Sequence, residues 1–194
     1  TVAEQRLVPH HMIDLCQPDE TITLGDYQRR AYQTIDFVLA NGRLPILVGG
    51  TGQYVKAVVE GWGIPEVPPH PRLRAALAQL PGTELARWLA HLDPEAAQKH
   101  DPRNLRRIIR ALEVTLVAGR PISQLQRKTP PRYRICQIGL KRPREELYAR
   151  IDARVEKMMA SGLLAEVKKL RDLGYGRSLP SRSGLGYPHL WSFL

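Results

Sequence analysis

The stretch Leu44-Pro-Ile-Leu-Val-Gly-Gly-Thr-Gly-Gln-Tyr54 decides how the rest of the chain is interpreted. Residues 44–48 form a short run of apolar, mostly branched side chains, which is typical of a buried strand in a parallel sheet. A helical pattern begins at residue 53 and ends at Gly61, a common C-terminal residue of helices. Strand, glycine turn and helix in this order can present free backbone N–H groups to an anion. The alternative is an ordinary glycine turn in which Thr51 is the N-cap of the helix.

The composition is that of a globular, strongly basic chain. Of its 194 residues 43% are hydrophobic, and no apolar run approaches the ~20 residues needed to span a bilayer. The opening residues 1–6 are too polar for a secretory signal. The two cysteines, Cys16 and Cys136, lack a metal-binding or redox spacing and indicate a reducing compartment. The formal net charge of +10 favours a polyanionic partner, either nucleic acid or a phosphorylated substrate.

The order of patterns along the chain predicts a core that is interrupted by helices. Apolar spacing predicts a helix over residues 24–41. A proline-rich segment, residues 65–71, then breaks the pattern, and only helical patterns follow until a branched, alternating run at residues 134–140. Two further helical patterns complete the chain. We therefore predict an α/β fold whose parallel-sheet core comprises residues 1–63 and 135–194, with an all-helical insertion over residues 64–134.

One predicted helix, residues 103–118, carries a row of arginines. Arg103, Arg106, Arg107 and Arg110 are spaced i, i+3, i+4 and i+7 and therefore share one helical face. Like charges stacked in this way cost stability unless an anion lies against them, and guanidinium groups suit phosphate oxygens. A solvated basic face is the alternative. The clustering favours contact with nucleic acid.

Six stretches occur in an order and at a spacing that together are specific. They are Pro9-His-His-Met-Ile-Asp14, residues 44–54, Asn104-Leu-Arg-Arg-Ile-Ile-Arg-Ala-Leu-Glu113, Arg150-Ile-Asp-Ala-Arg-Val155, Met159-Ala-Ser-Gly-Leu163 and Gly184-Leu-Gly-Tyr187. In them the chain resembles the tRNA dimethylallyltransferases, also called tRNA isopentenyltransferases. The resemblance implies a P-loop NTPase-like core with a helical insertion. It also implies a cytoplasmic prenyltransferase that moves a dimethylallyl group from its diphosphate to N6 of the adenosine 3′ of the tRNA anticodon, position 37.

The resemblance also implies roles for individual residues. Thr51 and Arg154 are the expected catalytic residues, and the expected diphosphate-binding residues are Gly49, Gly50, Thr51, Arg150 and Arg154. The expected tRNA-binding residues are Arg103, Arg106, Arg107, Ile109, Arg110, Ser183, Gly184, Gly186 and Tyr187. Mg²⁺ is expected to bind with the diphosphate and not at a metal site of the protein. The expected partners are the anticodon stem-loop and dimethylallyl diphosphate, without a membrane, and the expected state is a monomer.

Two features of the resembled family are missing from the sequence. No GxxxxGK[ST] phosphate-binding loop occurs, and the aspartate that serves the family as general base has no counterpart. We therefore expect an incomplete copy of such an enzyme, which binds RNA but transfers no dimethylallyl group. Two alternatives stay open: an isopentenyltransferase that acts on free adenine nucleotides, and a non-catalytic RNA-binding fragment. A P-loop kinase is disfavoured because it needs no long basic insertion.

Overall fold

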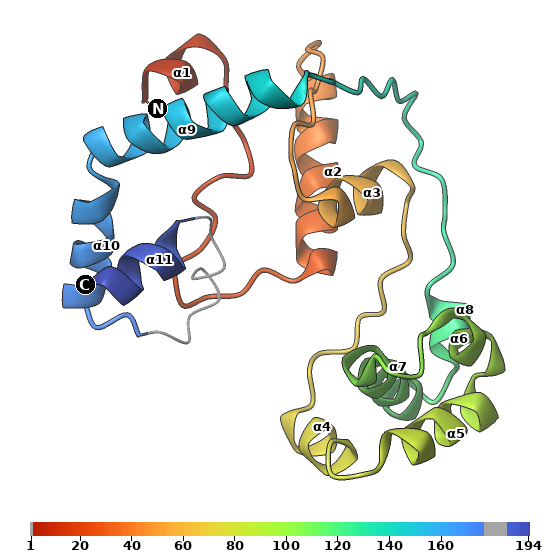
Figure 1. Cartoon of the computed structure of the whole chain (residues 1–194). Coiled ribbons are helices and arrows are strands. Elements are labelled where there is room, and N and C mark those ends of the chain that lie inside the picture. Colours follow the sequence, from red (N-terminus) through yellow and green to blue (C-terminus); the bar gives the residue numbers. More distant parts are fainter. Residues whose placement is uncertain (1, 177–185) are drawn as a thin grey trace. The chain divides into compact units, whose positions relative to one another are not determined.

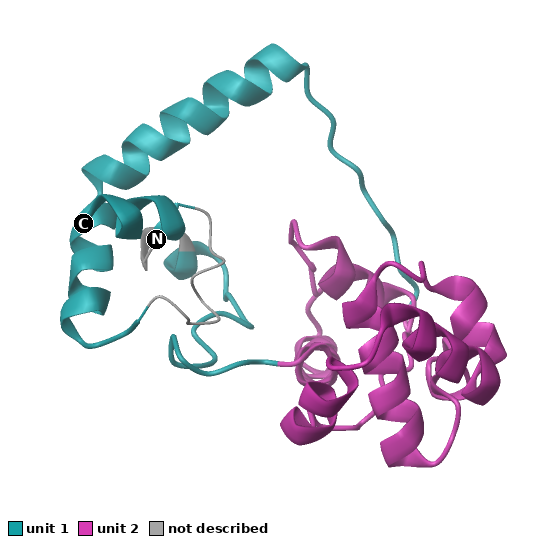
Figure 2. Ribbon diagram, turned by 60° about the horizontal axis from the view of Figure 1, so that its bottom comes forward, with its two compact units in different colours: residues 1–22, 134–194 teal, residues 23–133 magenta. Residues whose placement is uncertain are grey.

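A computed structural model describes residues 2–176 and 186–194, and Figure 1 shows this part of the chain as a succession of helices. The helices are α1 (Val2–Leu7), α2 (Leu24–Ala40), α3 (Gly52–Val59), α4 (Pro71–Leu77), α5 (Gly82–Leu92), α6 (Pro94–Lys99), α7 (Leu105–Ala118), α8 (Ile122–Leu125), α9 (Arg144–Ala160), α10 (Leu163–Asp172) and α11 (Tyr187–Phe193). They belong to two compact units (Figure 2): unit 1 comprises residues 1–22 and 134–194, and unit 2 comprises residues 23–133. These boundaries differ from the predicted ones, because residues 23–63 are grouped with the helices that follow them.

The prediction of a parallel-sheet, P-loop NTPase-like core is wrong for this structure, because the described residues contain no β-strand. Residues 44–48 and 134–140, both expected to be buried strands, are irregular. Val48 is 85% exposed and Leu140 is 95% exposed. A strand forms only where a neighbouring strand supplies hydrogen bonds and a packed layer covers one of its faces. Neither segment has such a neighbour among the described residues, so an apolar pattern alone does not make a strand here.

Helix α2 of unit 2 begins at a capping pair formed by Thr23 and Asp26. The Asp26 N–H donates to Thr23 Oγ1 over 3.1 Å, and the Thr23 hydroxyl donates to the Asp26 carboxylate over 2.6 Å. This pair satisfies one of the backbone donors that the first turn of a helix leaves free. The side chain of Gln28 then ties α2 to the end of α3, since its amide donates to the carbonyl of Ala57 over 2.6 Å and to that of Trp62 over 2.9 Å. The pair α2 and α3 is thereby fixed to the start of the linker that leads to α4.

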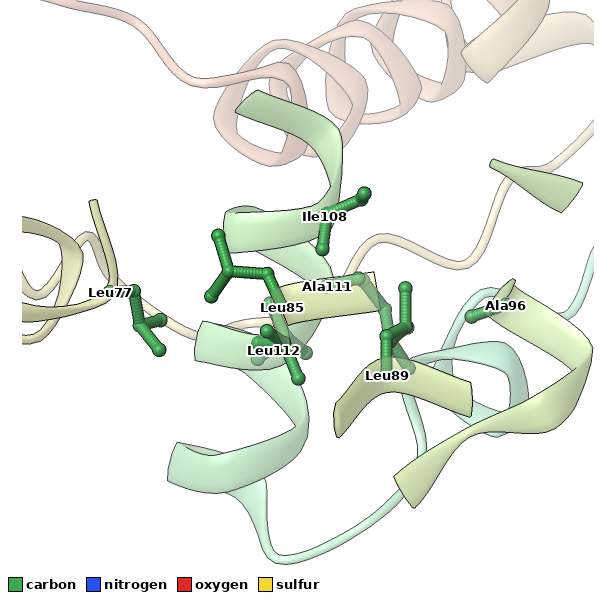
Figure 3. Packing of buried hydrophobic residues seen from close by; sticks show 9 residues of the cluster. Leu77, Leu85, Leu89, Ala96, Ile108, Ala111 and Leu112 are labelled. Carbon is green, nitrogen blue, oxygen red and sulfur yellow. The ribbon is translucent and has the colours of Figure 1, made fainter. Parts of the chain in front are cut away.

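Helices α4 to α8 share the one extensive hydrophobic core that the described residues form (Figure 3). Its buried members are Leu77, Leu85, Leu89, Ala96, Ile108, Ala111, Leu112, Val114 and Ile122. Helix α7 supplies four of them and packs against α4, α5 and α8. Asn104 caps its start, and Gly119 ends it at a φ of 63°, a left-handed conformation that glycine adopts without strain. The predicted helices of this region are confirmed to within a few residues.

Unit 1 is packed far less tightly. Helix α9 contains no buried residue, and only Val167 is buried in α10. Helix α11, which the sequence patterns did not predict, packs against α10. Most of the described side chains of α9 are therefore exposed to solvent or available to a partner.

Two linkers of unit 2 meet beyond the end of α3, and we call their meeting point the neck, residues 61–63 and 127–129. The Thr129 N–H donates to the Gly61 carbonyl over 2.7 Å, and the Gly63 N–H donates to the Arg127 carbonyl over 3.0 Å. The φ of Gly61 is +60°, and a Cβ placed on this residue would lie 1.7 Å from the Thr129 carbonyl oxygen. Both the conformation and the close approach therefore require glycine at this position.

We expect Gly61→Ala to destabilise the chain by about 3 kcal/mol. Alanine is strained in the left-handed conformation, and its methyl group would in addition clash with the second linker. The matched control is Gly119→Ala, whose φ is +63° but whose Cβ would meet nothing within 4 Å. The control should therefore cost only about 1 kcal/mol. Urea denaturation monitored by circular dichroism measures both losses. Equal losses in the two variants would show that the neck does not hold the linkers together.

Candidate functional site

The arginine row predicted for the basic helix lies on α7 and just before it. Arg106 and Arg107 occupy the first turn of α7 and are exposed, and neither forms an ion pair with a described residue. Arg103 precedes the helix, and its guanidinium contacts the Asp101 carboxylate through two hydrogen bonds of 3.1 Å. Its side chain is nevertheless 91% exposed. Three of the four predicted arginines thus present positive charge to solvent.

The buried face of α7 holds this row in place. Ile108, Ala111 and Leu112 are each no more than 1% exposed and point into the core that Figure 3 shows. Ile109, which was predicted to bind tRNA, is half-buried and packs against the same core. The helix therefore cannot rotate about its axis without exposing apolar surface, so the face of α7 that carries the arginines stays turned to the surface.

Arg110, the fourth arginine of the row, is engaged inside the protein. One of its terminal nitrogens donates to the Glu113 carboxylate over 2.6 Å, and the other donates to the Val67 carbonyl over 2.9 Å. The Glu113 side chain is completely buried. It also accepts hydrogen bonds from the His70 N–H over 2.6 Å and from two nitrogens of Arg74 over 2.8 Å each. We call Glu113, Arg74, Arg110 and the His70 amide the Glu113 cluster.

The Glu113 cluster keeps its carboxylate ionised. Burial raises the pKa of Glu113, but the hydrogen bonds from Arg74, the His70 amide and Arg110 outweigh burial and lower that pKa to about 2. The carboxylate in turn raises the pKa of Arg74, mainly by accepting its hydrogen bonds. Sequence patterns missed the roles of Glu113 and Arg74. The available signal was a single acid between Leu112 and Val114, on the apolar side of an otherwise basic helix.

The predicted diphosphate-binding residues form two groups. Gly49, Gly50 and Thr51 lie in the turn before α3, where Thr51 is exposed and makes no capping hydrogen bond through its side chain. Arg150 and Arg154 are exposed on α9, one turn apart. The glycine turn belongs to unit 2 and the two arginines belong to unit 1. Their meeting in one diphosphate site stays a prediction.

The last predicted stretch lies near the C-terminal end of the chain. Ser183 and Gly184 lie outside the described residues. Gly186 precedes α11 at a φ of 94°. The Tyr187 hydroxyl donates to the Glu166 carboxylate of α10, and burial together with that carboxylate raises the pKa of Tyr187 to about 12. In this structure the Tyr187 hydrogen bond therefore connects α11 to α10.

The described residues contain neither a cluster of metal-ligating side chains nor a helix that could cross a membrane. No three of their histidine, cysteine, aspartate and glutamate side chains gather closely enough to hold a metal ion. Among the described helices, none combines the length and the apolar character that crossing a membrane requires.

Comparison with known proteins identifies the family. The model of the IPP transferase family matches residues 1–194, so the chain belongs to that family. It is 54% identical over 191 residues to a tRNA dimethylallyltransferase of Herpetosiphon aurantiacus, covering 96% of this chain and 61% of the relative. It is 53% identical over 192 residues to a tRNA dimethylallyltransferase of Chloroflexus aggregans, covering 96% of this chain and 64% of the relative. The chain thus spans less than two thirds of the length of these relatives.

Solved structures agree with this assignment. A full-length tRNA isopentenylpyrophosphate transferase of Bacillus halodurans matches with a TM-score of 0.63 and 36% identity, over 100% of this chain and 61% of that protein. A tRNA delta(2)-isopentenylpyrophosphate transferase of Staphylococcus epidermidis matches with a TM-score of 0.60 and 29% identity, over 100% of this chain and 64% of that protein. The family resemblance noted from the motifs is therefore confirmed along the whole chain.

The Glu113 cluster predicts a specific acid sensitivity. Because the pKa of Glu113 is lower in the folded chain than in the unfolded one, its stabilisation is complete above about pH 4.5 and is lost as the pH falls towards 2. We expect Glu113→Gln to lower the free energy of unfolding at pH 7 by roughly 2 kcal/mol, after allowing for the half-exposed arginines, and to flatten its decline below pH 4.5. Urea denaturation across this pH range measures the effect. Asp19→Asn, at an exposed carboxylate that makes no hydrogen bond or ion pair with a described residue, is the control and should leave the decline nearly unchanged.

Proposed function

We propose that this chain is part of a tRNA dimethylallyltransferase, which transfers a dimethylallyl group from dimethylallyl diphosphate to N6 of the adenosine 3′ of the anticodon, position 37. The observation that carries the proposal is the match of the IPP transferase model to all 194 residues. The relatives that are about half identical in sequence bear the names of tRNA dimethylallyltransferases, which supports tRNA as the acceptor.

The basic side of unit 2 is proposed to hold the RNA. Arg103, Arg106 and Arg107 are exposed on or beside a helix whose opposite face is buried, and exposed guanidinium groups bind phosphate oxygens well. A rigid helix that fixes the RNA contributes positioning and not chemistry. The anticodon stem-loop is the proposed ligand of this side.

The reaction breaks the allylic C–O bond of the diphosphate ester and forms a bond from that carbon to N6 of adenine, while N6 loses a proton and diphosphate departs. Negative charge therefore grows on the leaving oxygens and needs fixed donors. The turn at Gly49, Gly50 and Thr51 is proposed to supply backbone N–H groups and the Thr51 hydroxyl. A Cβ placed on Gly50 would meet nothing within 4 Å, so the backbone of this turn is accessible to a ligand. Arg150 and Arg154 are proposed to supply positive charge.

Magnesium enters this proposal only with the diphosphate. A Mg²⁺ ion on the diphosphate would neutralise part of its charge. No group of three ligating side chains occurs among the described residues, and no step is assigned to the ion. A cytoplasmic location and a monomeric state stay predictions.

A free adenine nucleotide is the alternative acceptor, and RNA binding without transfer is the alternative activity. The arginine row of α7 favours RNA over a free nucleotide, because a nucleotide needs no extended basic surface. An assay with labelled dimethylallyl diphosphate distinguishes transfer to tRNA, transfer to a free nucleotide and RNA binding without transfer. The protein that contains this chain is given the label together with either unmodified tRNA or adenosine monophosphate. Label in tRNA alone supports the proposal, and label in neither acceptor contradicts it.

Replacing both Arg106 and Arg107 by Gln should weaken binding of tRNA to the 194-residue chain. Each lost phosphate contact should reduce the slope of log Kd against log salt concentration by about one unit. The control is Arg30→Gln with Arg43→Gln, which removes the same charge from exposed positions on and after α2. An unchanged slope in the Arg106 and Arg107 variant would mean that this face is merely solvated.

Replacing Arg154 by Ala should slow dimethylallyl transfer in the protein that contains this chain. Loss of one fixed donor to the leaving group should cost on the order of 10²–10³ in kcat. The affinity for tRNA should change little, because the RNA is proposed to bind unit 2. Arg144→Ala, at the first residue of α9, is the control and should leave the rate of transfer unchanged. Unchanged turnover of the Arg154 variant at saturating dimethylallyl diphosphate would remove Arg154 from the site.

A further inference from the structure

Arg74, one of the two cations of the Glu113 cluster, uses only some of its N–H groups within the cluster. Arg74, on α4, directs its Nε and one terminal nitrogen to Glu113 over 2.8 Å each, a two-pronged contact along one edge of the guanidinium. Its remaining N–H groups make no hydrogen bond within the described part of the chain. The Arg74 side chain is 41% exposed, although Glu113 beside it is completely buried. The second edge of a rigidly held guanidinium is therefore free to bind a ligand.

The cluster as a whole carries surplus positive charge. Two arginines, Arg74 and Arg110, share a single carboxylate, so the cluster has a net charge of one positive unit. The His70 amide is a third donor to the same carboxylate. Every acceptor position of the Glu113 carboxylate therefore already has a donor. An additional anion would bind to the arginines without displacing Glu113 from them.

The position of Arg74 extends the arginine row. Along α7, Arg106 and Arg107 are followed one turn later by Arg110, and Glu113 comes almost one turn after that. Because Arg74 is hydrogen-bonded to Glu113, its guanidinium lies beyond the end of the row, on a neighbouring helix. The positive charge therefore continues from α7 onto α4.

We propose that Arg74 binds a phosphate of the RNA and that Glu113 is the positioning residue that holds the Arg74 and Arg110 guanidinium groups in register with Arg106 and Arg107. The inference rests on the proposed RNA binding of unit 2 and enlarges the RNA-binding surface by a second helix. A buried carboxylate at the edge of an RNA-binding surface then has a function beyond stability. It removes the freedom of two long side chains before the ligand arrives, which reduces the entropy lost on binding.

The experiment measures binding of the 194-residue chain to an unmodified tRNA at several salt concentrations. Arg74→Gln keeps an amide that can donate to Glu113 but removes the charge. It should weaken binding on the order of tenfold and reduce the salt slope by about one unit. Arg72→Gln is the control, because Arg72 is exposed on the same helix but lies two residues away, about 200° around its axis. The control should change neither quantity.

Glu113→Gln tests the positioning role by the sign of its effect. This change makes the chain more positive, so electrostatic attraction alone predicts tighter binding of RNA. Loss of positioning predicts weaker binding, and weaker binding is the expected result. Circular dichroism verifies that each variant is folded. If Arg74→Gln or Glu113→Gln does not fold, Arg74→Lys replaces it. Lysine keeps the positive charge but lacks the planar pair of N–H groups, the fork, with which a guanidinium binds two oxygens at once. It should therefore lower the affinity for tRNA while leaving the salt slope unchanged.

The outcomes separate this inference from the proposal on which it rests. Should Arg74→Gln bind like the wild-type chain while the Arg106 and Arg107 variant binds weakly, Arg74 is structural and only this inference fails. Should Arg74→Lys also bind like the wild-type chain, the fork has no part in binding and the inference fails in the same way. If the wild-type chain binds no tRNA, both the inference and the proposed RNA binding fail.

Discussion

The buried carboxylate of Glu113 is the constraint on which the arrangement of the helical unit depends. An ionised group without solvent is tolerated only when donors surround it, and here a backbone amide and two arginines do so. Those donors come from the linker before α4, from α4 and from α7. One side chain therefore determines where the linker reaches the core, while the apolar residues beneath α7 determine how that helix is rotated.

This constraint connects the packing of the unit to its surface. A solvated arginine samples many rotamers, whereas an arginine bonded to a buried acid occupies few. The helical unit combines both kinds: Arg106 and Arg107 are free to adapt to a ligand, and Arg74 and Arg110 are held in place. Such a combination suits an irregular anion such as a folded RNA, since fixed contacts set its position and mobile contacts follow its local shape.

The sequence allowed accurate prediction of local structure and poor prediction of long-range pairing. The apolar spacing that predicts α2 and α7 lies within each helix, and the residues that cap them, Thr23, Asn104 and Gly119, directly flank the helices. The expected strand at residues 44–48 depended on a neighbour distant in sequence, which no local pattern reveals. The same limit applies to the site. Spacing revealed the arginine row, but the pairing of Glu113 with Arg74, 39 residues away, required the folded structure.

The neck also affects the order in which this unit forms. The contacts among α5, α6 and α7 join neighbours in the sequence, so little chain entropy is lost when they form. The bonds from Thr129 to Gly61 and from Gly63 to Arg127 instead close a loop that contains all of α4 to α8. We therefore expect the helical core to assemble early and the neck to close late. A helical unit whose two ends meet in this way can fold as an autonomous segment within a longer polypeptide.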